Sequence, residues 1–288
     1  MKKFYSVFLL FCLIILSAGC SARYTGTGLD DLYRSSKILS KSLTGIFSEV
    51  IDEDMELRAR RSIDKTVISV KDLEPVIVSY QNLRTRKELI ESCVKYSLLL
   101  KSFFSKDHTS AVREYGEDLK ANLSTIRSHD PGLVPEKAAG IISTIITMAP
   151  EGYTFVRKKK FALKLMGEMQ KVIDKVFEKL KEEINSLKLL APNLYTRLFR
   201  EKVEKQWPDK KDKRVKYALT GVKIIKSRER FIDLSEELLK VLELFPSEHK
   251  KLMSQFSKKG STLTGLTDLL NYSIRLKNSY EQLSEGEK

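Results

Sequence analysis

Side chains suited to acid–base or metal chemistry are few in this chain of 288 residues. The three histidines, His108, His129 and His249, each stand in a polar turn or at the end of an expected helix. No two of them are spaced i,i+4, and none joins a cysteine in a ligand pattern, so the sequence predicts no metal site. Motifs for a serine nucleophile or a phosphate-binding loop do not occur either. We therefore expect no catalytic residue, no cofactor and no enzymatic activity.

The three cysteines have different expected roles. Cys12 lies inside an apolar N-terminal run, Cys20 ends that run, and Cys93 stands alone in a helical pattern. A lone thiol cannot form an internal disulfide, and such a cysteine more often packs as a small apolar side chain than reacts. The sequence thus predicts a folded part without disulfides, held together by packing.

The first twenty residues, MKKFYSVFLLFCLIILSAGC, have the order of a secretory signal. Two lysines precede an uncharged apolar run, and small residues lead to Cys20. This order resembles the signal peptide and lipobox of bacterial lipoproteins, although Ser17 stands where that family usually has leucine. The alternative, an uncleaved anchor, is disfavoured because the run of about 15 residues is shorter than the roughly 20 that span a bilayer.

The lipoprotein resemblance implies cleavage between Gly19 and Cys20 and acylation of Cys20 by palmitate-type chains. Residues 1–19 would be the signal peptide, and residues 20–28 the lipidated cysteine with a short flexible tether. Two or three acyl chains give a stable membrane anchor. Ser21, where an aspartate would favour the inner membrane, implies the outer membrane, on its periplasmic or surface face.

Apolar residues at spacings of three and four predict helices over nearly all of the remaining chain. Prolines 192 and 246 are expected to break it, as are turns near residues 130 and 150. The expected helices cover 29–63, 75–104, 110–127, 135–148, 153–190 with a short continuation to 207, 213–245 and 247–283. The last segment is weakened by glycines 260 and 265. The pattern predicts an all-α antiparallel bundle of about seven or eight helices over 29–284, with a subdivision near residue 150 left open and a disordered tail over 285–288.

Two further runs are interpreted structurally. The acidic run at 52–56 lacks the ligand pattern of a calcium loop, and Asp54–Arg58 and Glu56–Arg60 are expected as i,i+4 ion pairs on a solvated face. Residues 138–150 carry no charge but are too few to span a membrane. We expect them to form a helix that is buried on all sides within the bundle.

Positive charge is concentrated in one segment. Residues 21–152 contain 19 basic and 19 acidic side chains, and residues 231–288 contain 8 and 9, whereas residues 153–230 contain 23 and 10. Solvated helix faces could account for this excess, and so could attraction to an anionic surface. The candidate anion-binding surface consists of Arg157, Lys158, Lys159, Lys160, Lys210, Lys211, Lys213, Arg214 and Lys216. Aromatic residues do not alternate with these clusters, so we expect no nucleic-acid partner.

These features predict a lipid-anchored, non-enzymatic protein of the bacterial cell envelope. It would act as a binding, adaptor or structural component, with membrane lipids, another anionic envelope surface or an acidic protein as its partner. The alternative is a lipoprotein that captures one specific protein, such as an immunity, surface-exclusion or secretion-accessory factor. A hydrolase of envelope polymers is the third hypothesis, and the sequence leaves the oligomeric state open.

Overall fold

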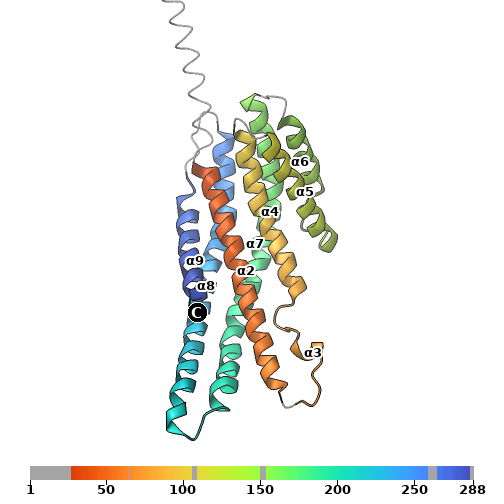
Figure 1. The fold of residues 1–288 in the computed structure, drawn as a ribbon. Coiled ribbons are helices and arrows are strands. Elements are labelled where there is room, and N and C mark those ends of the chain that lie inside the picture. Colours follow the sequence, from red (N-terminus) through yellow and green to blue (C-terminus); the bar gives the residue numbers. More distant parts are fainter. Residues whose placement is uncertain (1–26, 64, 106–108, 150–153, 259–264, 286–288) are drawn as a thin grey trace, which may run out of the picture. The chain divides into compact units, whose positions relative to one another are not determined.

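The structure is a computed structural model that describes residues 27–285, except 64, 106–108, 150–153 and 259–264 (Figure 1). The predicted signal peptide, Cys20, most of the tether and residues 286–288 lie outside the described residues. None of the described helices is long and apolar enough to cross a membrane.

The described residues form eight α-helices and one π-helical turn, and no strand is found among them. In chain order these are α2 (Thr27–Arg61), α3 (Val70–Leu73), α4 (Tyr80–Phe104), α5 (Thr109–His129), α6 (Glu136–Met148), α7 (Phe155–Phe199), η2 (Arg200–Glu204), α8 (Lys211–Ser257) and α9 (Thr267–Glu285). The all-α helical bundle predicted from the sequence is confirmed. Cys93 is the free cysteine of the described part, and it is buried.

The chain divides into two compact units. Unit 1 comprises Met1–Ser36, Ser92–Asp174 and Pro246–Leu270; unit 2 comprises Lys37–Glu91, Lys175–Phe245 and Asn271–Lys288. The long helices α2, α4, α7 and α8 each contribute to both units. No boundary lies near residue 150, where the sequence left a subdivision open.

In unit 1, the core is formed by the apolar faces of α2, α4, α5, α6, α7 and α8. Leu32, Leu99, Met166 and Leu252 are completely buried. Gly116 on α5 lies so close to α6 that an added Cβ would be 2.5 Å from the Ile146 side chain. This close approach favours glycine, because any side chain there would have to displace the Ile146 side chain.

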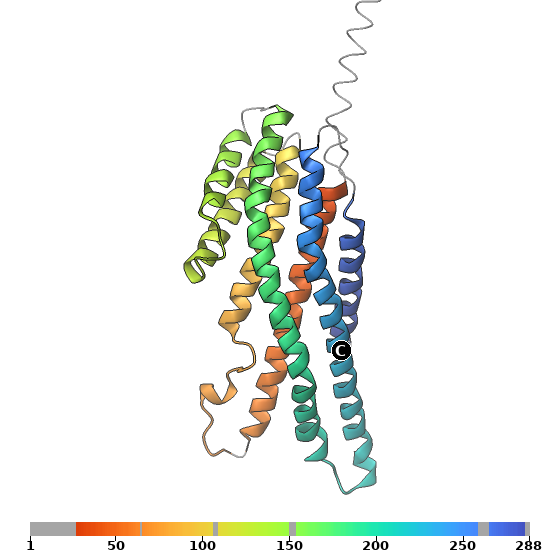
Figure 2. The same ribbon diagram turned by 180° about the vertical axis from the view of Figure 1, so that it is seen from behind.

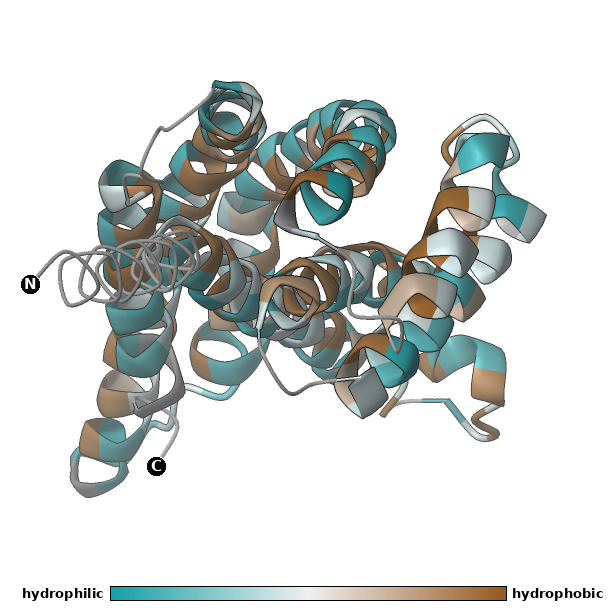
Figure 3. Cartoon of the chain, turned by 90° about the horizontal axis from the view of Figure 1, so that it is seen from above, coloured by the Kyte–Doolittle hydropathy of each residue, from teal (hydrophilic) through white to brown (hydrophobic). Residues whose placement is uncertain are grey.

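In unit 2, α2, α4, α7, α8 and α9 pack along one another, and consecutive long helices run in opposite directions (Figures 1 and 2). The rings of Phe177 and Phe245 stack with 4.6 Å between centroids. Gly45 on α2 gives Tyr280 of α9 room to pack against the α2 backbone. Viewed from above, the helices show hydrophobic and hydrophilic stretches on different sides (Figure 3), as amphipathic helices do.

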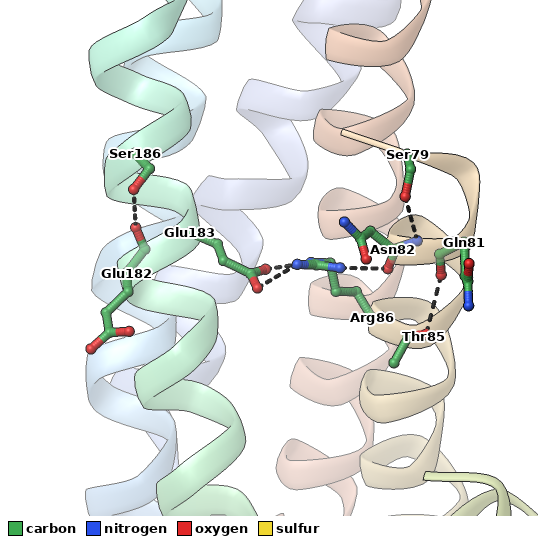
Figure 4. A network of polar contacts seen from close by, with 8 residues as sticks. All are labelled: Ser79, Gln81, Asn82, Thr85, Arg86, Glu182, Glu183 and Ser186. Carbon is green, nitrogen blue, oxygen red and sulfur yellow. Dashed lines mark hydrogen bonds and ion pairs between the residues drawn. The ribbon is translucent and has the colours of Figure 1, made fainter. Parts of the chain in front are cut away.

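Polar contacts also connect the helices of unit 2. Figure 4 shows Arg86 of α4 forming a two-pronged ion pair with both carboxylate oxygens of Glu183 on α7. The Arg86 guanidinium also donates a hydrogen bond of 2.8 Å to the carbonyl oxygen of Asn82. The planar guanidinium matches a carboxylate in this geometry, so the pair fixes how α4 and α7 are aligned within unit 2.

The predicted breaks at Pro192 and Pro246 are wrong, because α7 and α8 continue through both residues. A proline removes one backbone hydrogen bond, at a cost of about 3 kcal/mol. Around Pro192, burial of Ala191, Leu194 and Tyr195 favours the helix. The carbonyl of Pro246 accepts a hydrogen bond from Gln170. The last expected segment, weakened by glycines 260 and 265, is divided between two helices, because α8 ends at Ser257 and α9 starts at Thr267.

The predicted helix start at Pro75 is also wrong, since α4 begins at Tyr80. Glu74 has the extended ψ of 134° that is typical of a residue before proline. The amides of Val76 and Ile77 then donate to the Asp54 carboxylate, at 2.6 and 3.1 Å. A tertiary acceptor therefore satisfies backbone groups that would otherwise belong to a helix.

The uncharged run does not form the fully buried helix that we expected. Ala138, Ile142, Ile145 and Met148 of α6 are buried, but Gly140 and Thr147 are exposed. The outward hydroxyls of Thr144 and Thr147 donate to carbonyls of the preceding turn. Small residues and threonines thus make the outer side of α6 polar without any charge.

Candidate interaction surfaces

The first predicted basic cluster, Arg157 to Lys160, starts α7 in unit 1 and is only partly available to a partner. Arg157 and Lys160 are exposed. Lys158 is half-buried, with its ammonium 5.5 Å from the centroid of the Phe103 ring, and burial lowers its pKa. Lys159 donates a hydrogen bond of 2.9 Å to the carbonyl oxygen of Lys258. At least two of the four cations, Lys158 and Lys159, therefore make contacts within the unit.

The second cluster lies at the start of α8 in unit 2. Lys210, Lys211, Lys213 and Lys216 are exposed. Arg214 differs from them, because its guanidinium donates to the carbonyl oxygens of residues 208 and 209 and caps the turn that precedes α8. Lysines thus supply the accessible charge of this cluster, and Arg214 supports the local fold.

The same part of α8 exposes an apolar stripe that sequence analysis missed. The exposed fractions of Val215, Leu219, Val222 and Ile225 are 63, 59, 46 and 47%. Spacings of four and three residues place Val215, Leu219 and Val222 on one side of the helix. Exposed Lys211, Lys216, Lys223 and Lys226 surround this stripe. We call these eight residues the α8 face. A helical-wheel search for a second apolar side in the basic segment could have found it.

The opposite side of α8 holds this face in place. Ile224 is 8% exposed, and Gly221 is buried against α7, where an added Cβ would lie 2.8 Å from the Phe199 ring. Further along the helix, Phe231, Leu234 and Leu238 are completely buried. The α8 face therefore belongs to a helix that is fixed by its core side, and its apolar residues are not part of the core.

Unit 2 also contains a cleft of about 420 Å³ between the end of α2, the segment around α3, and α7. Five basic and two acidic side chains line it, together with aliphatic and uncharged polar ones. The lining residues are Asp54, Leu57, Arg58, Arg61, Ser62, Lys65, Lys71, Asp72, Val76, Ile77, Leu190, Asn193, Leu194 and Arg197. Sequence analysis did not find this cleft, since its residues come from three separate segments.

Asp54 has a different role from the one predicted for it. The ion pairs Asp54–Arg58 and Glu56–Arg60 are present, with distances of 3.7 and 2.9 Å. However, Asp54 is only 5% exposed, and its Oδ2 accepts the two amide hydrogen bonds from residues 76 and 77. Asp54 therefore fixes one wall of the cleft and does not lie on a solvated face.

His249 lies in the core of unit 1, whereas we had expected it at the polar end of a helix. Its Nε2 is 2.7 Å from the Tyr96 hydroxyl and its Nδ1 is 2.6 Å from Oε1 of Gln170. Gln170 Nε2 in turn donates to Asp174 Oδ1 at 2.8 Å. Because an amide oxygen only accepts, Nδ1 carries the proton, and Nε2 accepts from Tyr96. Burial lowers the pKa of His249 to about 4, so the ring is neutral near pH 7.

This buried network is suited to stability rather than to catalysis. Tyr96 and His249 have no exposed surface, so a dissolved substrate cannot reach the imidazole in the folded unit. Burial also raises the pKa of the nearby Cys93 thiol to about 12 and disfavours the reactive thiolate. Cys93 is 2% exposed, which confirms the prediction that it packs as a small apolar side chain.

Of the other two histidines, His108 lies outside the described residues and His129 ends α5. Within the described ranges, no group of three or more histidine, cysteine or acidic side chains is placed to hold a metal ion. Comparison with known proteins finds no family model, no curated protein and no solved structure that matches this chain.

Proposed function

We propose that the chain is a lipid-anchored, non-enzymatic protein of the bacterial cell envelope that binds an anionic membrane surface through the α8 face. Cys20 would provide the lipid anchor. The α8 face would hold the folded part against phospholipid headgroups, so that the protein acts as an adaptor or structural component there.

The combination of apolar and basic side chains on the α8 face is the observation that carries this proposal. Interfacial helices insert apolar residues at the level of the headgroups, while lysines beside them approach the lipid phosphates. Each basic side chain close to an anionic leaflet contributes about 1 kcal/mol. A polymer of carboxylates would need the lysines but would gain nothing from Val215, Leu219 and Val222.

Binding to vesicles tests the proposal directly. The purified protein is sedimented with phosphatidylglycerol-containing vesicles and with phosphatidylcholine vesicles over a series of salt concentrations. Because the lipid anchor binds both kinds of vesicle, chain without residues 1–20 is measured in parallel. We expect this shortened chain to bind anionic vesicles in a salt-sensitive way and to bind neutral vesicles at least tenfold more weakly.

Two double variants separate the charge from the apolar stripe. Replacing Lys223 and Lys226 by glutamate should remove most of the anionic preference. Replacing Leu219 and Val222 by serine should weaken binding at every salt concentration without changing the salt dependence. The matched control reverses the charges of Arg157 and Lys160 in unit 1, and we expect a smaller loss because no apolar stripe adjoins them.

An acidic protein is the alternative partner of the α8 face. Exposed apolar patches with a polar rim are also typical of protein interfaces. The shortened chain would then fail to bind either kind of vesicle, while cross-linking from residue 219 in cells would trap one defined protein. That pair of results would replace the membrane by a protein partner.

A further inference from the structure

We infer that the cleft in unit 2 binds a small phosphate ester, in which a phosphate group is joined to an apolar body. This ligand site is separate from the lipid anchor and from the α8 face, and it goes beyond the proposed function. The charges, the available donors and the walls of the cleft all fit such a ligand.

Basic side chains outnumber acidic ones in the cleft, and the acidic ones already accept hydrogen bonds from protein groups. Its five basic side chains are Arg58, Arg61, Lys65, Lys71 and Arg197, and its acidic ones are Asp54 and Asp72. Asp54 accepts the amides of residues 76 and 77, and Asp72 accepts from Lys65 and from the amide and hydroxyl of Ser69. The carboxylates thus stabilise the walls, and cations remain for a ligand.

Several of these basic side chains have N–H donors that are available to a ligand. Arg197 and Lys71 are exposed and make no ion pair within the described residues. The Arg58 side chain is 28% exposed, although its Nε is buried 3.7 Å from the Asp54 carboxylate without a hydrogen-bond partner among the described atoms. Arg61 is 3.8 Å from Glu201, which is a long contact for an ion pair. Guanidinium groups recognise phosphate through paired N–H donors, and Lys71 would add a point charge.

The remaining walls are aliphatic and partly open to solvent. Leu57 and Leu194 are buried at the bottom, while Val76 and Leu190 line the cleft with 69 and 47% of their surface exposed. An apolar ligand body would cover these two side chains. The volume of about 420 Å³ falls in the range of roughly 300–1,000 Å³ that is typical of small-molecule sites. A bare phosphate ion would leave most of this space and the aliphatic walls unused.

The test is titration of full-length protein, held in an uncharged detergent, with phenyl phosphate by calorimetry. Inorganic phosphate presents the anion alone, and phenol presents the ring alone. We expect phenyl phosphate to bind about tenfold more tightly than inorganic phosphate, because only it also buries apolar surface. Equal affinities of the two phosphates, or no binding of phenyl phosphate, would overturn the proposal.

Variants then locate the binding. Arg197→Gln should lower the affinity for phenyl phosphate about tenfold, as expected when one hydrogen-bonded charge is removed. The control Arg113→Gln removes the same charge from an exposed position on α5 of unit 1 and should change affinity less than twofold. If both variants lose affinity equally, the binding is nonspecific and the site is wrong.

A third variant tests the apolar wall. Leu190→Asn leaves every cation in place, and the half-exposed position makes misfolding a small concern. It should weaken the binding of phenyl phosphate several-fold and leave the binding of inorganic phosphate unchanged.

A parallel titration with dihexanoylphosphatidic acid separates two sources of the phosphate ester. Tighter binding than that of phenyl phosphate indicates a lipid headgroup, and weaker binding indicates a soluble metabolite. Failure of all these ligands would leave the vesicle binding of the α8 face untouched.

Discussion

The two units differ in how many large apolar side chains they expose. Unit 1 buries a hydrogen-bonded chain from Tyr96 through His249 and Gln170 to Asp174. Unit 2 leaves large apolar side chains in solvent, mostly within 63–80, 189–190 and 215–225, and also at Trp207 and Ile274. Within the described part of unit 1, Val156 is the exposed large apolar side chain. A buried polar group contributes to one defined packing, whereas an exposed apolar group costs free energy unless a partner covers it. The comparison is the reason why both proposed binding surfaces lie in unit 2 and why the largest loss of stability is expected in unit 1.

The largest effect is expected from His249→Ala in unit 1. The change leaves a cavity and removes the partners of the Tyr96 hydroxyl and of Gln170 Oε1, so we expect a loss of about 4 kcal/mol in the free energy of unfolding. Urea denaturation measures it. Lys250→Ala, the neighbouring exposed position, should cost about 0.5 kcal/mol or less. A similar small loss for His249→Ala would show that the network does not stabilise unit 1.

The low pKa of His249 predicts that the stability of the folded protein depends on pH. Its pKa is about 4 in the folded protein and 6.5 when exposed, so the unfolded chain binds the proton more readily between these values. Stability should then decrease as the pH falls from 6.5 to 4, by about 3 kcal/mol for this group. Urea denaturation at several pH values measures this loss. The variant His249→Gln serves as the reference, because it keeps the contribution of the carboxylates and lacks that of the imidazole. Parallel pH profiles of the two proteins would contradict the neutral, buried imidazole.

A smaller effect is expected from Asp54→Asn in unit 2. Loss of the charged acceptor weakens two amide hydrogen bonds, and we expect a cost of about 1–2 kcal/mol. Hydrogen exchange at Val76 and Ile77 should become faster, since these amides are then released. Asp52→Asn, an exposed position on the same helix, should change neither quantity. Unchanged exchange at 76 and 77 in the Asp54 variant would mean that Asp54 does not fix the wall of the cleft.

The smallest effect is expected on the α8 face. Leu219→Ser should change the free energy of unfolding by no more than about 0.5 kcal/mol, because the side chain is already in solvent. Leu238→Ala on the buried side of the same helix should cost about 2–5 kcal/mol. Thermal or urea denaturation of both variants measures the difference. A large loss for Leu219→Ser would place this residue in the core and remove the argument for a binding face.

Local sequence patterns were sufficient to predict the helices and many of the buried core positions. Leu32, Leu39, Leu43 and Phe47 recur on one side of α2, and all four are buried. Helical periodicity depends on near neighbours in the chain, so it can be read from the sequence. The breaks predicted at Pro192 and Pro246 failed because side-chain burial around them outweighs one lost hydrogen bond.

The sequence identified the segment that carries the basic residues, but it did not show which of their side chains are accessible. Lys158 turned out to be half-buried beside Phe103, and Arg214 caps a turn. Neither role is visible in a run of positive charges, because each depends on a group brought near by folding. The lipid anchor at Cys20 stays a prediction from the sequence.

The sequence by itself determined the helical class, the concentration of basic charge in residues 153–230 and the unpaired state of Cys93, the cysteine of the described part. These properties follow from composition and from spacings within single helices. Only the tertiary structure decided that His249 is a neutral core residue, that Asp54 holds the segment before α4, and that Arg58, Lys71 and Arg197 line one cleft. Those outcomes depend on residues that lie 13 or more positions apart in the chain. A single sequence carries no information on which distant groups meet, because many packings satisfy the same helical pattern.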